Sequence, residues 1–256
     1  MRRAVAVAVG ALLLAAGCAR GAHEPAATTA AAAHQPAVPI LLYHHLATPP
    51  RGDPHGSLWV TPARFTAHVA ALYRAGFHAV TLAAVWRAWH GGAALPSRPV
   101  VITFDDGFGD QDTVARPVLA RHGWPGVLNL QVNHLDTRGG LSRAAVARMV
   151  RAGWEVDDHT TTHPDLTHVS AARLKAEVSG SRAALRRALG IDPMFFCYPY
   201  GRVDARVRRA VKAAGFAAAT TIEPGRATAS DDPLMLPRII VRGTTTPAVL
   251  VTLARG

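Results

Sequence analysis

The stretch Val100-Val101-Ile102-Thr103-Phe104-Asp105-Asp106-Gly107 decides how this sequence is interpreted. Residues with strand propensity precede two adjacent carboxylates, and Gly107 then permits the backbone of a tight turn. A strand that ends in this way presents an acid pair at its carboxyl end, as the strands of α/β enzymes do. Asp-Asp-Gly is also an ordinary turn that closes a strand, so the pair alone leaves both interpretations open.

A pair of histidines follows another short apolar run. In His159-Thr160-Thr161-Thr162-His163-Pro164 the two imidazoles are four residues apart, which brings them to one face of a helical turn. Together with one carboxylate of the acid pair they form a His2Asp set, which holds a metal ion and leaves a coordination position for water. The second carboxylate is then free to act as a base. Because the chain has 13 histidines, a surface pair is the alternative.

The two segments and a third, Tyr198-Pro199-Tyr200-Gly201, resemble in order and context the motifs of the polysaccharide deacetylases of carbohydrate esterase family 4, the NodB-homology domain. The resemblance covers residues 38 to 254. It implies an α/β fold, a distorted (β/α)7 barrel of the NodB-homology type. It also implies roles for named residues: Asp105 as the catalytic base, Asp106, His159 and His163 as the metal ligands, and the backbone N–H of Tyr200 as an oxyanion donor.

The expected general acid is displaced in this chain. Family members of the usual order carry a Leu-x-His near the C-terminus, but residues 249–254 contain no histidine. Leu42-Tyr43-His44 near the N-terminus looks like the same motif moved to the front, as in the circularly permuted exopolysaccharide deacetylases that process poly-β-1,6-N-acetylglucosamine. We therefore expect His44 to be the acid. His45 should point to the opposite face of the strand and have a structural or supporting role.

A second departure concerns the third motif. Many relatives have Arg-x-Pro-Tyr, in which the Arg contacts the catalytic Asp, whereas this chain has Cys197 at the corresponding position. Arg238, in Leu236-Pro237-Arg238-Ile239, could supply the missing guanidinium from another strand. Cys197 itself is expected to be a small buried residue rather than a nucleophile.

The activity that the resemblance implies is metal-dependent hydrolysis of N-acetyl groups on an N-acetylglucosamine-containing cell-surface polysaccharide, either an exopolysaccharide or peptidoglycan. Zinc is the default ion for the ligand set, and cobalt, nickel or iron are compatible with it. Two alternatives remain open. One is an O-acetyl esterase that acts on polysaccharide, and the other is a sugar-binding lipoprotein that kept the metal but lost the chemistry.

The N-terminus predicts export. Met1-Arg2-Arg3 precedes a short apolar run too short to span a bilayer, so residues 1–17 are expected to be a signal peptide. Gly17-Cys18 resembles a bacterial lipobox, in which Cys18 would be lipidated and anchor an extracytoplasmic protein to the membrane; with ordinary cleavage the protein would be secreted. Residues 18–37 then form a flexible Ala/Pro/Thr tether, and 38–256 the catalytic domain.

Charge and cysteine content restrict the partners. The formal charge of +11 favours anionic surfaces such as wall polymers or lipid head groups, although a solvated basic surface is the simpler interpretation. The basic residues are scattered and lack interleaved aromatic residues, so nucleic-acid binding is not expected. With Cys18 lipidated, Cys197 has no disulfide partner. We expect a monomer.

Short apolar runs alternate with helical patterns that end at Gly, which indicates βα units. Besides the strands around residues 38–45 and 100–104, strands are predicted near 77–80, 126–131, 154–156, 195–198, 216–220 and 238–241. Helices are predicted near 61–76, 111–121, 142–151, 170–189, 204–214 and 247–253.

Overall fold

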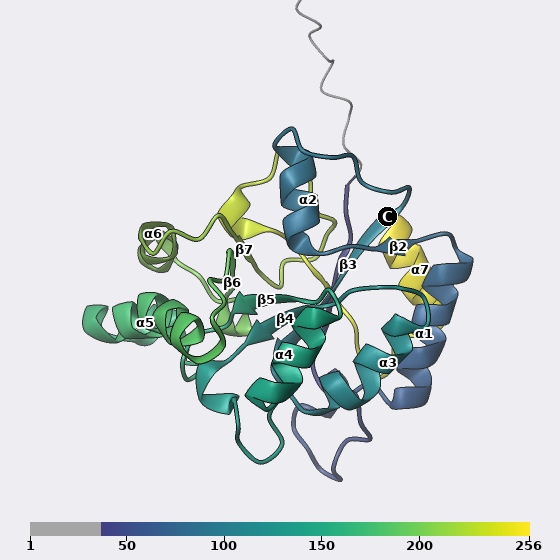
Figure 1. Ribbon diagram of the computed structural model, residues 1–256, viewed down its shortest axis with the longest axis horizontal. Coiled ribbons are helices and arrows are strands. Elements are labelled where there is room, and N and C mark those ends of the chain that lie inside the picture. The colour runs from purple at the N-terminus through teal and green to yellow at the C-terminus, as the bar shows by residue number, and fades with distance from the viewer. Residues whose placement is uncertain (1–36) are drawn as a thin grey trace, which may run out of the picture. The chain divides into compact units, whose positions relative to one another are not determined.

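The computed structural model describes residues 37–256 (Figure 1). The predicted signal peptide, Cys18 and nearly all of the tether lie outside the described residues. Within residues 37–256 no helix is long and apolar enough to cross a membrane. All paired strands are parallel, and their bounds are β1 Ile40–Tyr43, β2 His78–Ala79, β3 Pro99–Asp106, β4 Val127–Leu130, β5 Glu155–Asp158, β6 Phe195–Cys197, β7 Ala218–Thr220 and β8 Ile239–Ile240.

The sheet is curled into a distorted barrel. Its strand order is β7-β6-β5-β4-β3-β1-β8, with β2 paired to β3. The segment 236–240 brings the two ends of this order together: Leu236 forms a parallel bridge to Thr220 at the end of β7, and Ile240 pairs with Leu42 of β1. We call segment 236–240 the seam. The (β/α) barrel that the sequence predicted is confirmed.

The side chains of β3 alternate between two layers of the core. Ile102 and Phe104 belong to a cluster that also contains Phe65 and Leu119 of the surrounding helices. Val101 belongs to a second cluster inside the barrel, with Val127. Thr103 and Asp105 continue the inward-facing series, as the two-residue period of a strand requires. The alternation thus carries the first carboxylate of the acid pair into the barrel.

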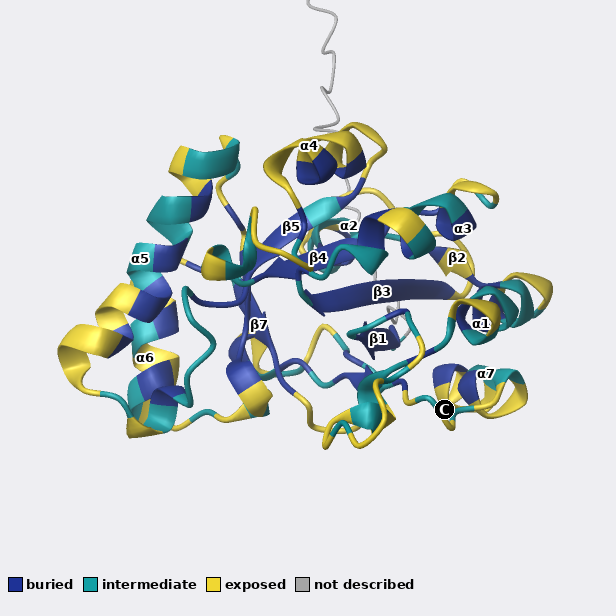
Figure 2. Ribbon diagram, turned by 90° about the horizontal axis from the view of Figure 1, so that it is seen from below, coloured by how far each residue is buried: buried dark blue, intermediate teal, exposed yellow. Residues whose placement is uncertain are grey.

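Helices cover the outside of the sheet and expose only their outer faces (Figure 2). Two of them, α1 and α7, pack against each other. The bounds are α1 Pro62–Arg74, α2 Leu82–Trp89, α3 Arg116–Ala120, α4 Arg143–Arg151, α5 Ala171–Leu189, α6 Ala205–Ala213 and α7 Pro247–Arg255.

One helix was not predicted. Helix α2 begins after Thr81, whose hydroxyl accepts a hydrogen bond from the N–H of Ala84 and so caps the helix. Its buried residues Leu82 and Val85 join the cluster inside the barrel at the amino ends of the strands. Since those ends are filled, the functional groups collect at the opposite, carboxyl ends.

Candidate active site

A cavity of about 680 Å³ opens at the carboxyl ends of the strands. Six strands or the segments that follow them contribute to its wall, which gathers residues that are far apart in the sequence. All the side chains that the sequence singled out for chemistry line it: His44, Asp105, Asp106, His159, His163, Tyr200 and Arg238.

Asp105 is buried and held by four side-chain contacts. Arg238 donates from Nη1 to Oδ1 at 2.8 Å and from Nη2 to Oδ2 at 2.9 Å. Asn129 donates from Nδ2 to Oδ1 at 2.6 Å, and the Cys197 thiol lies 3.6 Å from Oδ2. This bidentate guanidinium contact fixes both the position and the plane of the carboxylate.

Arg238 reaches Asp105 because it lies on the seam of the barrel. Its side chain is 1% exposed, and its Nε donates to the carbonyl of Thr221 at 2.8 Å. Nη2 also donates to Cys197 Sγ at 3.1 Å. The guanidinium therefore contacts both Asp105 and Cys197, the residue at the third-motif position where the resemblance predicts an arginine.

These surroundings set the charge of Asp105. Burial alone would raise the pKa of its carboxyl, but the charges of Arg238 and His159 and the hydrogen bonds from Arg238 lower the pKa well below its usual range. The carboxyl is consequently ionised at neutral pH and able to accept a proton.

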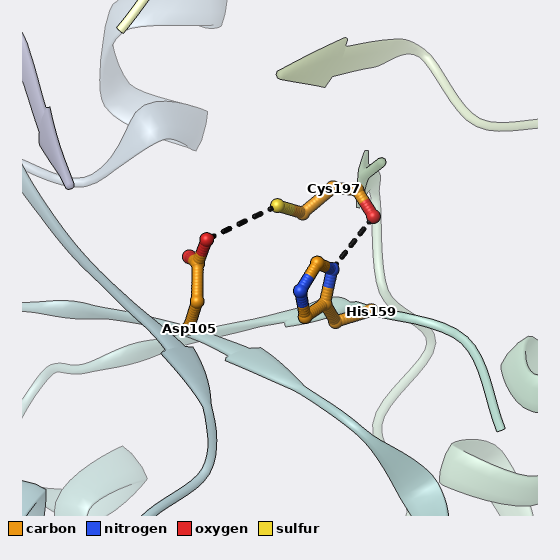
Figure 3. A group of neighbouring side chains, drawn as sticks. All are labelled: Asp105, His159 and Cys197. Carbon is orange, nitrogen blue, oxygen red and sulfur yellow. Dashed lines mark hydrogen bonds between the residues drawn. The ribbon is translucent and has the colours of Figure 1, made fainter. Parts of the chain in front are cut away.

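Asp106 and the two histidines converge on one point. Asp106 Oδ1 lies 3.5 Å from His159 Nε2 and 3.6 Å from His163 Nε2. His159 Nδ1 donates to the carbonyl of Cys197 at 2.7 Å (Figure 3). This leaves Nε2 free to face Asp106. A ligating histidine typically has its other ring nitrogen fixed in this way.

The residues fit a metal ion. Asp106 Oδ1 is buried and has no hydrogen-bond donor among the described residues, so the site presents an unsatisfied anionic oxygen. Two donors that are each about 2.1 Å from a tetrahedral zinc ion lie about 3.4 Å apart, close to the separations found here. The ligand atoms of Asp106, His159 and His163 all lie within 4.8 Å of one another.

A second group with possible ligand atoms consists of Asp105, His159 and Cys197 (Figure 3). It is a poorer site for a cation, because the guanidinium of Arg238 already contacts both the carboxylate and the thiol. A metal ion there would have to replace or repel that buried positive charge. The group at Asp106 is therefore the candidate metal centre.

Three residues of the site have left-handed backbone conformations that L-residues rarely adopt. The φ angles are 71° at Asp106, 57° at His163 and 58° at Tyr200. Such conformations persist only where the surroundings hold them, and they collect at functional sites. In Tyr200, which follows β6 in the turn Pro199–Gly201, the ring is half exposed and lies against His163.

His44 and His45 follow β1 and have different surroundings. His44 Nδ1 is buried and has no partner among the described residues, and burial lowers the pKa of the ring although Asp105 and Asp106 act in the opposite sense. The His45 ring is stacked between Trp59 and Phe108, with centroid distances of 3.6 and 3.5 Å.

The expectation that His45 points away from the His44 side does not hold, because both line the cavity. The strand ends at Tyr43, so the alternation of a strand does not extend to these residues. The supporting role predicted for His45 fits its stacking and its Nδ1, which lies 3.5 Å from the Asp110 carboxylate.

Sequence reasoning missed two buried amides of the site. Asn129 interrupts an apolar strand at an inward-facing position, which was the available signal. Gln111 begins a π-helix, and its Nε2 donates to the carbonyls of Asp105 at 2.7 Å and of His44 at 3.4 Å. A π-helix frequently marks a functional site. The residue had been assigned only to a helix.

Comparison with known proteins agrees with this site. The family model for "Polysaccharide deacetylase" matches residues 92–219, which contain Asp105, Asp106, His159 and His163. The chain belongs to the polysaccharide deacetylase family. The expectation of an enzyme of this family, a hydrolase of carbohydrate metabolism, is thereby confirmed.

Individual relatives of this polysaccharide deacetylase are distant. It is 24% identical over 204 residues to a putative polysaccharide deacetylase, YxkH, of Bacillus subtilis, covering 80% of this chain and 71% of that one. It is 25% identical to the poly-β-1,6-N-acetyl-D-glucosamine N-deacetylase of Escherichia coli K12, covering 65% of this chain but only 31% of that protein. The Streptococcus pyogenes deacetylase PplD, solved with acetate, shares the fold with a TM-score of 0.79 and 24% identity, covering 86% of this chain and 99% of that one.

Proposed function

We propose that this protein removes N-acetyl groups from an N-acetylglucosamine-containing polysaccharide of the cell surface, by metal-dependent hydrolysis. The observation that carries the proposal is the position of Asp105. An ionised, rigidly held carboxylate lies beside a His2Asp group and the buried imidazole of His44, all in one cavity.

Each residue has a separate part in the proposed reaction. When bound by Asp106, His159 and His163, a divalent ion, with zinc the first choice, supplies a Lewis acid for the acetyl carbonyl and a water of lowered pKa. Asp105 takes the proton of the attacking water, and Arg238 keeps its carboxylate oriented.

The other side of the cavity completes the reaction. The backbone N–H of Tyr200 donates to the acetyl carbonyl oxygen, on which the negative charge develops in the tetrahedral intermediate. His44 gives a proton to the departing sugar amine, and the products are acetate and the free amine. The position of His44 after β1, next to β3 in the sheet, supports its assignment as the acid. The circular permutation inferred from Leu42-Tyr43-His44 remains a prediction.

The proposed location is extracytoplasmic, with the protein anchored through a lipid on Cys18 or secreted if that residue is not lipidated. The name of the E. coli relative, which specifies a β-1,6-linked N-acetylglucosamine polymer, supports the proposed substrate. Mass spectrometry of the membrane fraction of expressing cells would test the lipid on Cys18: a diacylglyceryl adduct supports anchoring, and an unmodified mature N-terminus elsewhere contradicts it.

Acetate release distinguishes the candidate activities. The purified zinc-loaded protein is given β-1,6- and β-1,4-linked N-acetylglucosamine oligomers and O-acetylated xylan in parallel. Release from an amide substrate that is abolished by a chelator supports the proposal and identifies the preferred linkage. Release from xylan alone supports the O-acetyl esterase, and metal binding without release from any substrate supports the sugar-binding protein.

A further inference from the structure

The loop between the two candidate histidine ligands is held by a buried carboxylate that takes no part in the proposed reaction. The loop comprises residues 160–163, which include the second ligand, and begins two residues after β5 ends at Asp158. Glu177 lies in the second turn of α5, and its side chain is only 1% exposed. A buried carboxylate is costly unless several donors satisfy it, so its contacts indicate what it holds.

Glu177 accepts three hydrogen bonds from the loop. Its Oε2 accepts from the backbone N–H groups of Thr161 and Thr162, each at 2.9 Å. Its Oε1 accepts from the hydroxyl of Thr162 at 2.6 Å. The half-exposed side chain of Arg173 adds an ion pair to Oε1 at 2.7 Å. The carboxylate thus binds two consecutive peptide groups of the loop.

The opposite side of the loop is also fixed. The N–H of Val132 donates to the carbonyl of Thr160, and the N–H of Asn133 to the carbonyl of Thr161, each at 3.0 Å. The Thr161 residue therefore donates to Glu177 on one side and accepts from the segment after β4 on the other. Movement of the loop in either direction breaks at least one of these bonds.

The loop needs such support because its backbone is strained at both ends. Thr160 has a φ of 70° and His163 a φ of 57°. A β-branched residue such as Thr is especially unfavourable in this region, and the conformation persists only when neighbouring structure holds it. Left unsupported, the loop would relax and His163 Nε2 would move from its place 3.6 Å from Asp106 Oδ1.

We propose that Glu177 is a positioning residue of the metal centre. By accepting hydrogen bonds from two consecutive peptide groups of the loop, it holds His163 in place to bind the ion. This inference rests on the proposed metal site. Helix α5 contributes no ligand itself, but through Glu177 it fixes the position of one of the three ligands, His163. Groups behind the ligands of a metal typically account for tenfold to a hundredfold in affinity.

Two substitutions at position 177 separate the effect of side-chain length from the effect of side-chain charge. Glu177→Gln removes the charge but keeps an oxygen at the same distance, which can still accept from both N–H groups. Glu177→Asp keeps the charge but withdraws the carboxylate by one methylene, out of hydrogen-bond distance. Zinc affinity is measured by competition with a chromophoric chelator, and thermal unfolding of the metal-free proteins reports folding separately.

We expect the Asp variant to bind zinc about tenfold to a hundredfold more weakly than the unsubstituted protein and the Gln variant to lose about threefold or less. Arg173→Met is the matched control, because it removes the half-exposed guanidinium, with its ion pair to Glu177 and its hydrogen bond to the Thr162 hydroxyl, and leaves the three bonds from the loop to Glu177. It should change affinity by less than about fivefold. Thr162→Val removes the hydroxyl contacts with Glu177 and Arg173 but keeps both backbone N–H bonds to Glu177, and it provides a milder variant if the Asp variant does not fold. It should weaken binding by about threefold to tenfold.

Equal zinc affinity in the Asp and unsubstituted proteins, or an equal loss in the Gln and Asp variants, would overturn the positioning role. If the Asp variant does not fold, unchanged affinity in Thr162→Val overturns it. Failure of the unsubstituted protein to bind zinc or another divalent ion stoichiometrically is a different result: it contradicts the proposed metal site, and the role of Glu177 with it.

Discussion

Both carboxylate oxygens of Asp105 accept a hydrogen bond from the guanidinium of Arg238, at 2.8 and 2.9 Å. The two residues are 133 positions apart in the sequence, and they meet because the seam pairs with β1, which lies next to β3 in the sheet. Cys197 occupies the position where the family resemblance led us to expect an arginine. The predictions below follow from this arrangement and from the groups around it.

Arg238→Ala should lower kcat by about 10² to 10⁴, because Asp105 loses its orientation and its low pKa. The metal content should be unchanged, since Arg238 contacts none of the three candidate ligands. The substitution also leaves a buried carboxylate unpaired, so we expect the free energy of unfolding to fall by about 3–5 kcal/mol. Turnover is measured with acetylated oligomers and zinc by elemental analysis; unchanged turnover in a folded, zinc-replete variant would refute the role.

His44→Ala should affect substrates according to their leaving group. A sugar amine needs a proton to depart, so its release should slow by about 10² to 10⁴. The phenolate of an aryl acetate ester leaves without protonation, and hydrolysis of such an ester should be much less affected. An equal loss on both substrates would argue against His44 as the general acid.

Zinc binding should strengthen as the pH rises from 6 to 8. Burial alone would lower the pKa of His159, but interactions with Cys197, Asp105 and Asp106 raise this pKa to about 10 in the metal-free protein. The pKa of His163 is instead lowered to about 4, by burial and by the charge of His159. Binding in this range must therefore displace one proton, from His159, and the affinity should rise about tenfold per pH unit. Chelator competition at several pH values measures this, and a flat profile would contradict it.

Two buried carboxyls below the site should make stability depend on pH. Burial and their mutual repulsion raise the pKa of Asp157, and burial raises that of its neighbour Glu155; each has an oxygen with no donor among the described residues. Because the folded-state pKa values exceed the unfolded values of about 4, the contribution of the pair is greatest at low pH and falls as the pH rises.

Asp157→Asn removes one of these charges and supplies an N–H donor toward Glu155. We expect it to be more stable than the unsubstituted protein at pH 8, by about 1 kcal/mol, the net contribution of one hydrogen bond. At pH 4 the two should differ little. Urea unfolding at both pH values is the measurement. Equal destabilisation of the variant at both pH values would contradict the raised pKa values of Asp157 and Glu155.

Local patterns in the sequence predicted much of the site. Asp105, Asp106, His159 and His163 belong to two short motifs, and their spacing already predicts a metal site beside a free carboxylate. The prediction of a hydrolase rested on the family resemblance. The seam contact of Arg238 was inferable only from similar segments in relatives, because no local pattern places residue 238 beside a strand so distant in the chain. Pairing of β8 with β1 supplies that placement.

Other features depended on long-range packing. Asn129 and Glu177 act through contacts 24 and 16 residues away, and each is a single polar residue in an otherwise unremarkable strand or helix. Helix α2 was missed because it has only eight residues, fewer than the window of about 11–18 residues over which a helical period is recognised. The helix is stabilised by the packing of Leu82 and Val85 against the core inside the barrel.

Paired substitution of the two neighbouring aspartates tests the central claim most directly. Asp105→Asn and Asp106→Asn make the same chemical change one residue apart, on a base held by Arg238 and on a ligand that faces two histidines. Acetate release and zinc content are measured on both. We predict that Asp105→Asn keeps its zinc and loses turnover by about 10² to 10⁴, whereas Asp106→Asn loses the zinc as well. Full zinc content in Asp106→Asn, or near-normal acetate release by Asp105→Asn, would contradict the assignment of base and ligand.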